Sequence, residues 1–145
     1  MIHQLSLSQR NTLAQALGQS GHHSTQAREV VYSILLTKRD HPTAEEVFLR
    51  VKAVAPRVSL GTVYKTLELL VASGFIRHVT FDREPARYCP NLGEHAHFHC
   101  QATGRVYDID LPHELQEQLL KILPEGYTAA NIKINIEGNG PNSTK

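Results

Sequence analysis

Residues 59–74 read SLGTVYKTLELLVASG, the clearest helical pattern in the chain. Ser59 is a suitable helix N-cap and Gly74 a suitable C-terminal stop, so a helix is predicted over 59–73. Its apolar side chains recur at helical spacing and form one stripe, made by Val63, Leu67, Leu70 and Val71. The other face carries polar side chains, namely Thr62, Tyr64, Lys65 and Glu68. The stretch therefore predicts a helix with one buried face and one face free to contact a partner.

Further helices are predicted before this stretch. Apolar spacing places them at residues 7–17, 27–35 and 43–54. Ser24 or Thr25 is a suitable N-cap for the second, and the third opens on the capping-box sequence Thr43-Ala44-Glu45-Glu46. Pro56 is expected to end the third helix.

A β-hairpin is predicted directly after Gly74. Residues 75–81 and 86–89 are rich in strand-forming side chains, and Asp82-Arg83-Glu84-Pro85 between them is typical of a turn. Helices followed by a hairpin are the order of a winged helix-turn-helix, in which 59–73 would be the recognition helix.

Residues 89–108 gather side chains that bind transition metals. They hold both cysteines of the chain and three of its nine histidines, and the set is Cys89, Glu94, His95, His97, His99, Cys100 and Asp108. The three histidines alternate with apolar residues, so on a strand their imidazoles share one face. A hairpin over 95–101 and 105–109, with a two-residue turn at 102–103, would place Asp108 opposite His97.

The last part of the chain predicts one more helix and one more strand. The helix starts at Asp110-Leu111-Pro112, and its apolar stripe is Leu115, Leu119, Ile122 and Leu123. Alternating isoleucines predict a strand over 127–137, and a disordered tail is expected over 139–145. The fold class is α+β, with a winged-helix domain over 1–89 and a small α/β domain over 90–138. The second domain is too thin to stand alone, so we expect it to dimerise through its sheet.

Composition is consistent with this division. The net charge is +1, but the two parts of the chain differ in sign. Residues 1–80 hold nine Lys/Arg and five Asp/Glu, whereas residues 81–145 hold six Lys/Arg and nine Asp/Glu. A basic first part permits nucleic-acid binding. Two cysteines inside the histidine-rich stretch argue against a secreted disulfide framework, and no apolar run suits a signal peptide or a membrane span. A cytoplasmic location with no membrane partner is expected.

The metal-binding set can be interpreted in more than one way. Thiolate and imidazole suit zinc or ferrous iron, so we expect Cys89, His95, His97 and a carboxylate such as Asp108 to be ligands, with His99 a weaker candidate. A small zinc enzyme is an alternative, because Glu94 could serve as its general base. A small zinc enzyme would leave the helix around Tyr64 without a function. A metal-storage or structural zinc module would not need the basic first part.

The exposed face of the helix over 59–73 is a candidate DNA-binding surface. Tyr64 could contact a thymine methyl group, whereas Lys65 and Arg28 could contact phosphates. The hydroxyls of Ser59 and Thr62 at the helix N-terminus also suit phosphate contacts, and Arg57 adds positive charge.

Two motifs carry a resemblance to a known family. Val58-Ser59-Leu60-Gly61-Thr62-Val63-Tyr64-Lys65-Thr66-Leu67 resembles the recognition helix of the ferric uptake regulator family. His95-Ala96-His97, followed by Cys100 and Thr103-Gly104, resembles its metal-binding hinge and dimerisation domain. The resemblance covers nearly the whole chain. It implies a homodimeric transcriptional repressor, not an enzyme, that binds an inverted-repeat operator in double-stranded DNA when one regulatory divalent metal per subunit closes the angle between the two parts.

The resemblance also implies a ligand set that departs from the family pattern in two places. The implied ligands are His41, Cys89, His95, His97 and Asp108. Iron and peroxide sensors usually have an acid at the position of Cys89, whereas zinc-sensing members have a cysteine there and some add a ligand from the wing, where His78 stands. The cysteine pairs of a structural four-cysteine zinc are also missing, because Thr103 replaces one cysteine and residues 138–140 contain none.

The two departures point in opposite directions. The segment 103–108 resembles peroxide sensors, some of which lack the structural zinc, whereas Cys89 favours zinc. We expect a peroxide-sensing repressor that uses Fe or Mn, with a zinc-responsive uptake repressor as the alternative.

Overall fold

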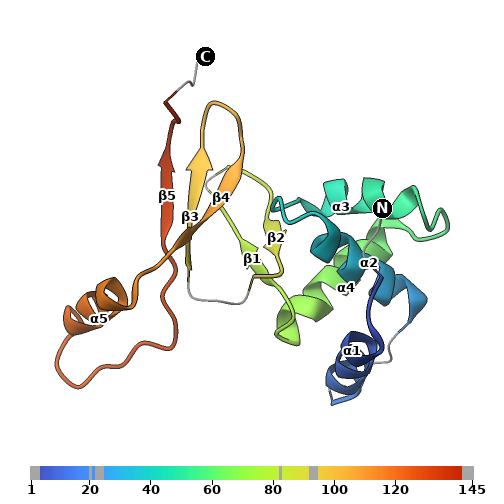
Figure 1. Ribbon diagram of the computed structural model, residues 1–145, viewed down its shortest axis with the longest axis horizontal. Coiled ribbons are helices and arrows are strands. Elements are labelled where there is room, and N and C mark those ends of the chain that lie inside the picture. Colours follow the sequence, from blue (N-terminus) through green and yellow to red (C-terminus); the bar gives the residue numbers. More distant parts are fainter. Residues whose placement is uncertain (1–3, 20, 22–24, 82, 92–94, 142–145) are drawn as a thin grey trace. The chain divides into compact units, whose positions relative to one another are not determined.

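The computed structural model describes residues 4–19, 21, 25–81, 83–91 and 95–141. The chain divides into two compact units, Met1–Leu92 and Gly93–Lys145, and each is described by itself (Figure 1). The division falls three residues after the boundary expected at 89. The elements are those of an α+β protein, which confirms the predicted fold class.

The first unit is built on four helices: α1 (Leu7–Gln19), α2 (Gln26–Thr37), α3 (Ala44–Lys52) and α4 (Leu60–Ala72). Three of them begin at side-chain caps, because Thr25, Thr43 and Ser59 each accept a hydrogen bond from a backbone N–H of the first turn. The stripes predicted for these helices meet in one core, whose fully buried members include Leu13, Leu17, Val31, Leu35, Val47, Val51, Val63, Leu67 and Leu70.

The end of α3 differs from the prediction. The helix stops at Lys52 rather than running to Pro56, and Val54, expected on its buried face, is 49% exposed. The backbone N–H groups of Val54 and Ala55 both donate to the Val51 carbonyl, which closes the helix before the proline is reached.

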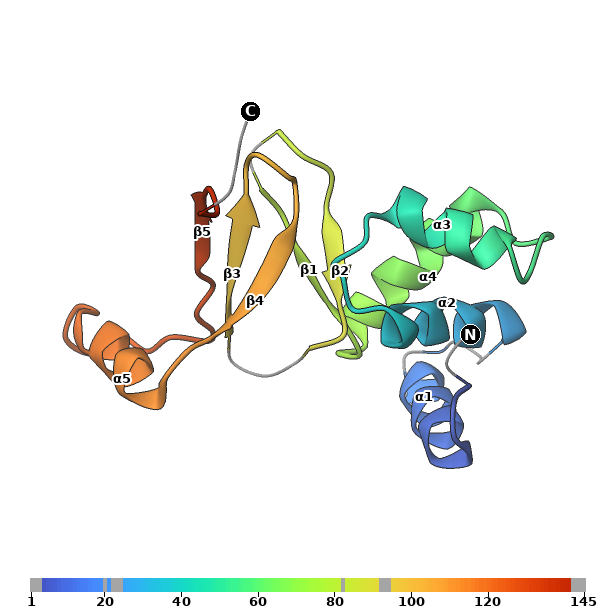
Figure 2. The same ribbon diagram turned by 45° about the horizontal axis from the view of Figure 1, so that its top comes forward.

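A short hairpin completes the first unit. Strands β1 (Arg77–Val79) and β2 (Arg87–Cys89) pair antiparallel after Gly74, whose φ of 80° ends α4 in the left-handed region. Helices followed by this hairpin form the winged helix-turn-helix expected from the sequence. Figure 2 shows β1 following α4, with β2 beside it.

Replacing Leu67 by alanine should lower the free energy of unfolding of the first unit by about 2–5 kcal/mol, because its side chain is fully buried. Urea denaturation followed by circular dichroism measures this loss. Leu49→Ala is the matched control, since Leu49 is 67% exposed and its truncation should cost less than about 0.5 kcal/mol. Equal losses for both variants would contradict the core described above.

The second unit is a three-stranded sheet with one helix. Strands β3 (His95–Cys100), β4 (Val106–Asp110) and β5 (Asn135–Gly138) are ordered β4-β3-β5, and α5 (His113–Lys121) lies between β4 and β5 in the chain. β3 pairs antiparallel with β4 and parallel with β5.

The predicted register of the β3–β4 hairpin is confirmed, although its predicted turn is wrong. His97 pairs with Asp108, as expected. The turn spans four residues rather than two, because Cys100 N–H donates to the Arg105 carbonyl and Gly104 adopts φ 74°. The predicted loop over 102–103 and the observed loop over 101–104 have the same centre. The residue pairs between β3 and β4 are therefore those that were predicted.

The C-terminal strand is shorter than predicted. Only Asn135–Gly138 pairs with β3, so residues 127–134 lie outside the strand. The expected tail over 139–145 starts within the packed unit, because Asn139 Oδ1 accepts a hydrogen bond from Ala102 N–H at 3.0 Å. Residues 142–145 lie outside the described part of the chain.

The two faces of this sheet differ in character. One carries the three histidines of β3, whereas the other carries an apolar group that we call the apolar sheet face: Phe98, Tyr107, Ile109 and Ile136. Three of these remain open to solvent, with exposures of 48% for Tyr107, 37% for Ile109 and 46% for Ile136. The predicted stripe of α5 is not buried either: the helix ends at Lys121 and has no buried residue, and Ile122 beyond it is 77% exposed. Apolar surface of this kind suits a partner chain.

Candidate metal centre and nucleic-acid interface

Three of the expected metal ligands converge on one face of the second unit's sheet, and we call them the sheet cluster: His95, His97 and Asp108. The two Nε2 atoms lie 3.1 Å apart, and each is 3.3 Å from Asp108 Oδ1. The alternation of β3 puts both imidazoles on one face, and the β3–β4 register brings the carboxylate across from His97. Both histidines are buried. Two imidazoles and a carboxylate aimed at one point can hold a divalent transition metal without rearranging their own strands.

Two further expected ligands lie together in the first unit, and we call them the hairpin pair: His41 and Cys89. A ring nitrogen of His41 and Cys89 Sγ are within 4.8 Å of each other. Each residue is only 3% exposed, and the Cys89 sulfur accepts a hydrogen bond from Asn91 N–H at 3.3 Å. His41 precedes α3 and Cys89 ends β2, so the pair depends on tertiary packing.

Of the weaker metal candidates, the structure describes His78 and His99. His78 pairs with Tyr88, whereas Cys89 pairs with Arg77, so alternation directs His78 to the opposite face of the hairpin from the thiol. His99 is buried, and its Nδ1 lies 3.8 Å from Glu137 Oε1 on β5. Glu94 lies outside the described residues.

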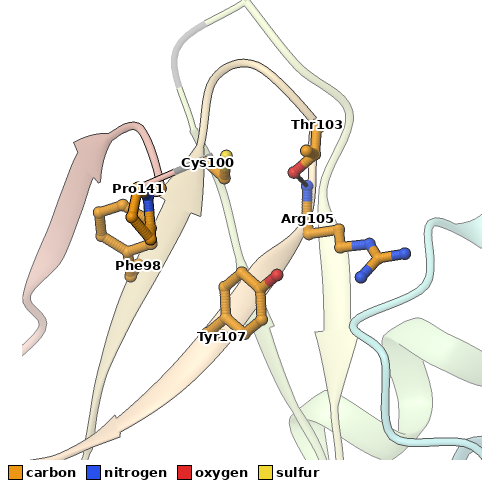
Figure 3. A pocket seen from close by; sticks show the side chains of 7 residues that line it. Phe98, Cys100, Thr103, Arg105, Tyr107 and Pro141 are labelled. Carbon is orange, nitrogen blue, oxygen red and sulfur yellow. Dashed lines mark hydrogen bonds between the residues drawn. The ribbon is translucent and has the colours of Figure 1, made fainter. Parts of the chain in front are cut away.

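Cys100 is buried in the second unit and faces a different environment from Cys89. It lines a pocket of about 540 Å³ together with Phe98, Thr103, Arg105, Tyr107, Gly140 and Pro141 (Figure 3). Thr103, which stands three residues after Cys100, accepts a hydrogen bond from Arg105 N–H at 3.3 Å. Position 103 therefore stabilises the turn.

The candidate DNA-binding residues lie on and around α4. Tyr64 is 40% exposed, and Lys65 and Arg57 are exposed as well, whereas Arg28 on α2 is half-buried. Ser59 and Thr62 are already engaged at the helix start. Ser59 Oγ accepts from Thr62 N–H at 3.1 Å and lies 3.0 Å from Thr62 Oγ1. Ser59 therefore caps α4 and Thr62 contacts the cap, whereas the side chains of Tyr64, Lys65 and Arg57 are exposed.

Polar contacts that the sequence does not reveal hold the loop before α3. Arg50 binds Asp40 with two hydrogen bonds, at 2.9 and 2.7 Å. Partial burial raises the pKa of Asp40, but the Arg50 hydrogen bond and charge outweigh it, and the net effect lowers this pKa. Arg87 approaches the same loop from β2. No local spacing marks either contact, because the partners are far apart in the chain.

Comparison with known proteins defines the family. A sequence model of the ferric uptake regulator family matches residues 19–137. The chain belongs to this family. Members of the family are metal-dependent, dimeric, DNA-binding transcriptional regulators and not enzymes, which leaves the small-zinc-enzyme alternative without support.

Among the curated relatives in the family is the peroxide-responsive repressor PerR of Staphylococcus aureus (strain USA300). It is 27% identical over 97 residues, which span 67% of this chain and 66% of that repressor. The chain thus aligns with about two thirds of the length of the curated relatives it matches.

Solved structures in the family agree on the fold. A zinc-bound manganese uptake regulator is 27% identical with a TM-score of 0.65, covering 89% of this chain and 98% of that one. The ferric uptake regulator of Pseudomonas aeruginosa with manganese is 24% identical with a TM-score of 0.73, covering 91% and 98%. The peroxide stress regulator of Campylobacter jejuni is 24% identical with a TM-score of 0.69, covering 94% and 97%.

Among the described residues, no helix has the length and apolar character needed to cross a membrane.

Proposed function

We propose that this chain is a cytoplasmic, homodimeric repressor that binds an inverted-repeat operator in its metal-loaded form and releases it on exposure to peroxide. The sheet cluster carries the proposal, because three donors of a family metal site converge within 3.3 Å of one another. The similarity to the peroxide-responsive repressor of S. aureus supports peroxide as the signal. Imidazole and carboxylate donors suit iron and manganese.

The ligands proposed for one metal belong to both units. The sheet cluster supplies His95, His97 and Asp108, and the hairpin pair supplies His41 and Cys89. Because only one arrangement of the two units lets all these side chains bind one ion, metal binding would favour that arrangement over others. The metal-loaded dimer would then present both recognition helices to the two half-sites of an operator.

Release of the operator would follow from oxidation of a metal-binding histidine. Bound iron would supply the chemistry that activates peroxide. Transfer of one oxygen atom from peroxide to a ring carbon of His41 or His95, with the other oxygen leaving as water, would give an oxidised ring that binds metal poorly. The two units would then no longer be held in the DNA-binding arrangement.

The apolar sheet face is proposed as part of the dimer interface. It places Phe98, Tyr107 and Ile136 side by side across the three strands, and Phe98 and Tyr107 already pack with ring centroids 6.4 Å apart. The exposed leucines of α5 extend the apolar surface of the same unit. A second copy of this unit would bury side chains that water now covers.

A zinc-responsive uptake repressor is the second candidate, and Cys89 is the observation that favours it. A thiolate is a softer ligand than the carboxylate usual in iron sensors, and zinc and thiolate form strong bonds. The sulfur lies within 4.8 Å of His41, so the two could bind one ion.

Two measurements test the proposal. Fluorescence anisotropy of an inverted-repeat operator should give tight binding with Fe²⁺ or Mn²⁺ and loss of binding with chelator; binding that ignores metal would refute it. Mass spectrometry of Fe²⁺-loaded protein after dilute peroxide should find one added oxygen on His41 or His95. Absence of this oxygen, together with a Cys89→Ser variant that loses zinc affinity far more than iron or manganese affinity, would favour the zinc-responsive repressor instead.

Lys65→Gln should weaken operator binding in the same assay and lower the slope of log K against log salt concentration by about 1, because one phosphate contact is lost. Lys52→Gln is the control. It removes the same charge from an exposed position at the end of α3, and it should leave the slope unchanged. An unchanged slope for Lys65→Gln would show that Lys65 makes no contact with a DNA phosphate.

A further inference from the structure

The backbone at His41 adopts a conformation that residues other than glycine seldom take. Its φ is 55°, in the left-handed region where Cβ crowds the backbone. Such a conformation persists only where neighbouring groups hold it. His41 is also buried, so solvent does not stabilise this conformation. The contacts of its loop must therefore determine where the imidazole lies.

Three contacts join the His41 loop to strand β2. Arg87 Nη1 donates a hydrogen bond to the His41 carbonyl at 3.1 Å. Tyr88 N–H donates to the Pro42 carbonyl at 2.9 Å, and Thr43 pairs with Arg87 as an isolated antiparallel bridge. Only the first contact comes from a side chain, so a substitution can remove it and leave the backbone pairing in place.

Strand β2 also carries the thiol of the hairpin pair. Arg87 and Cys89 are two residues apart, so their side chains leave the strand on the same face. Arg87 holds the backbone of His41, while Cys89 places its sulfur within 4.8 Å of the His41 ring. Tyr88 between them faces the other way and is buried in the core of the first unit.

The Arg87 side chain is itself anchored. It is only 16% exposed, and Nη1 lies 3.7 Å from Glu46 Oε1. Glu46 Oε1 accepts hydrogen bonds from the backbone N–H and the hydroxyl of Thr43, at 3.2 and 3.1 Å, within the capping box of α3. This nearby carboxylate directs the guanidinium toward the loop, so the start of α3 and the end of β2 are tied together at His41.

We propose that Arg87 is a positioning residue that holds the His41 imidazole beside the Cys89 thiol, ready to bind a divalent transition metal. The guanidinium has no lone pair to offer a metal, so Arg87 acts only through His41. Without it, the ligands remain in the chain but the His41 backbone must be ordered when the ion binds, which weakens binding. The inference rests on the proposed function, because it takes these two residues as metal ligands.

Cobalt(II) titration of the full-length protein tests this role. Co²⁺ reports its own ligands, because a thiolate bound to it adds a charge-transfer absorption band in the near ultraviolet. Arg87→Met should weaken Co²⁺ binding by about tenfold or more and reduce this band. Arg87→Lys should recover part of both, since its ammonium group can donate to the His41 carbonyl. Lys52→Gln, which removes one exposed charge from the same unit, should match the wild type.

A purely structural role is tested by Thr25→Ala. This change removes the N-cap of α2, which lowers the stability of the same unit and leaves the Arg87 bond to His41 in place. Positioning predicts that Thr25→Ala lowers the melting temperature with little effect on Co²⁺ affinity, whereas Arg87→Met lowers the affinity beyond any loss of melting temperature. If both variants lose affinity in proportion to their melting temperatures, or if Arg87→Met binds Co²⁺ like the wild type, the positioning role is overturned.

Operator binding measured in parallel separates this inference from the proposed function. Metal-dependent operator binding with an unchanged Co²⁺ affinity in Arg87→Met would overturn the positioning role alone. Weakened Co²⁺ binding in that variant, with a wild type whose operator binding ignores metal, would support the positioning role and refute the regulatory one.

Discussion

His97→Ala is expected to abolish metal-dependent operator binding. His97 lies at the centre of the sheet cluster, 3.1 Å from the His95 nitrogen and 3.3 Å from the Asp108 oxygen. Removing it leaves one imidazole and one carboxylate on this face, so metal affinity should fall by on the order of 100-fold or more. Isothermal titration with Mn²⁺ measures the affinity. Fluorescence anisotropy of a labelled operator at a fixed Mn²⁺ concentration measures the loss of operator affinity.

His113→Ala is the matched control for this variant. His113 also belongs to the second unit, but its side chain is 82% exposed and pairs with Glu117 on the surface of α5. Its loss should change neither metal affinity nor operator binding. If His97→Ala keeps the wild-type Mn²⁺ affinity while remaining folded, the sheet cluster is not the regulatory site.

Ile136→Asp is expected to dissociate the dimer. Ile136 pairs with Phe98 at the middle of the apolar sheet face and is 46% exposed within one subunit. A carboxylate buried there without a partner would cost several kcal/mol, which is about 100-fold or more in the dimer dissociation constant. Sedimentation velocity in metal-free buffer measures the shift from dimer to monomer. Operator binding should fall with it, because a monomer contacts one half-site only.

Asn135→Asp is the control for the dimer prediction. It adds a carboxylate to the same strand one residue earlier, on the face that carries the histidines. The dimer should survive this change in metal-free buffer. A dimer that withstands Ile136→Asp would show that subunits associate through another surface.

Much of the site could be predicted from the sequence because it depends on short-range periodicity. The period of two in β3 determines that His95 and His97 share a face, and the position of the turn centre determines that Asp108 lies opposite His97. The caps at Thr25, Thr43 and Ser59 depend on residues within one helical turn. Such features require no knowledge of what lies across the fold.

The features that sequence reasoning missed depend on distant partners. Alternating isoleucines predicted a strand over 127–137, but only the part that can reach β3 pairs with it, beginning at Asn135. The Arg87 contact with His41 spans 46 residues, and no spacing rule connects the two positions. His41 itself was expected only from the family resemblance. Its left-handed backbone is likewise invisible in the sequence.

Strand β3 would serve both proposed roles, since its odd-numbered positions carry the two histidines of the sheet cluster and its even-numbered positions include Phe98 of the apolar sheet face. A one-residue insertion or deletion between His95 and His97 would put the two imidazoles on opposite faces of the sheet, because the β3–β4 turn fixes the register of His97. The proposed metal site would then lose one ligand, and the proposed dimer face would gain a polar side chain. This segment can therefore diverge in the family by substitution far more readily than by a change in length.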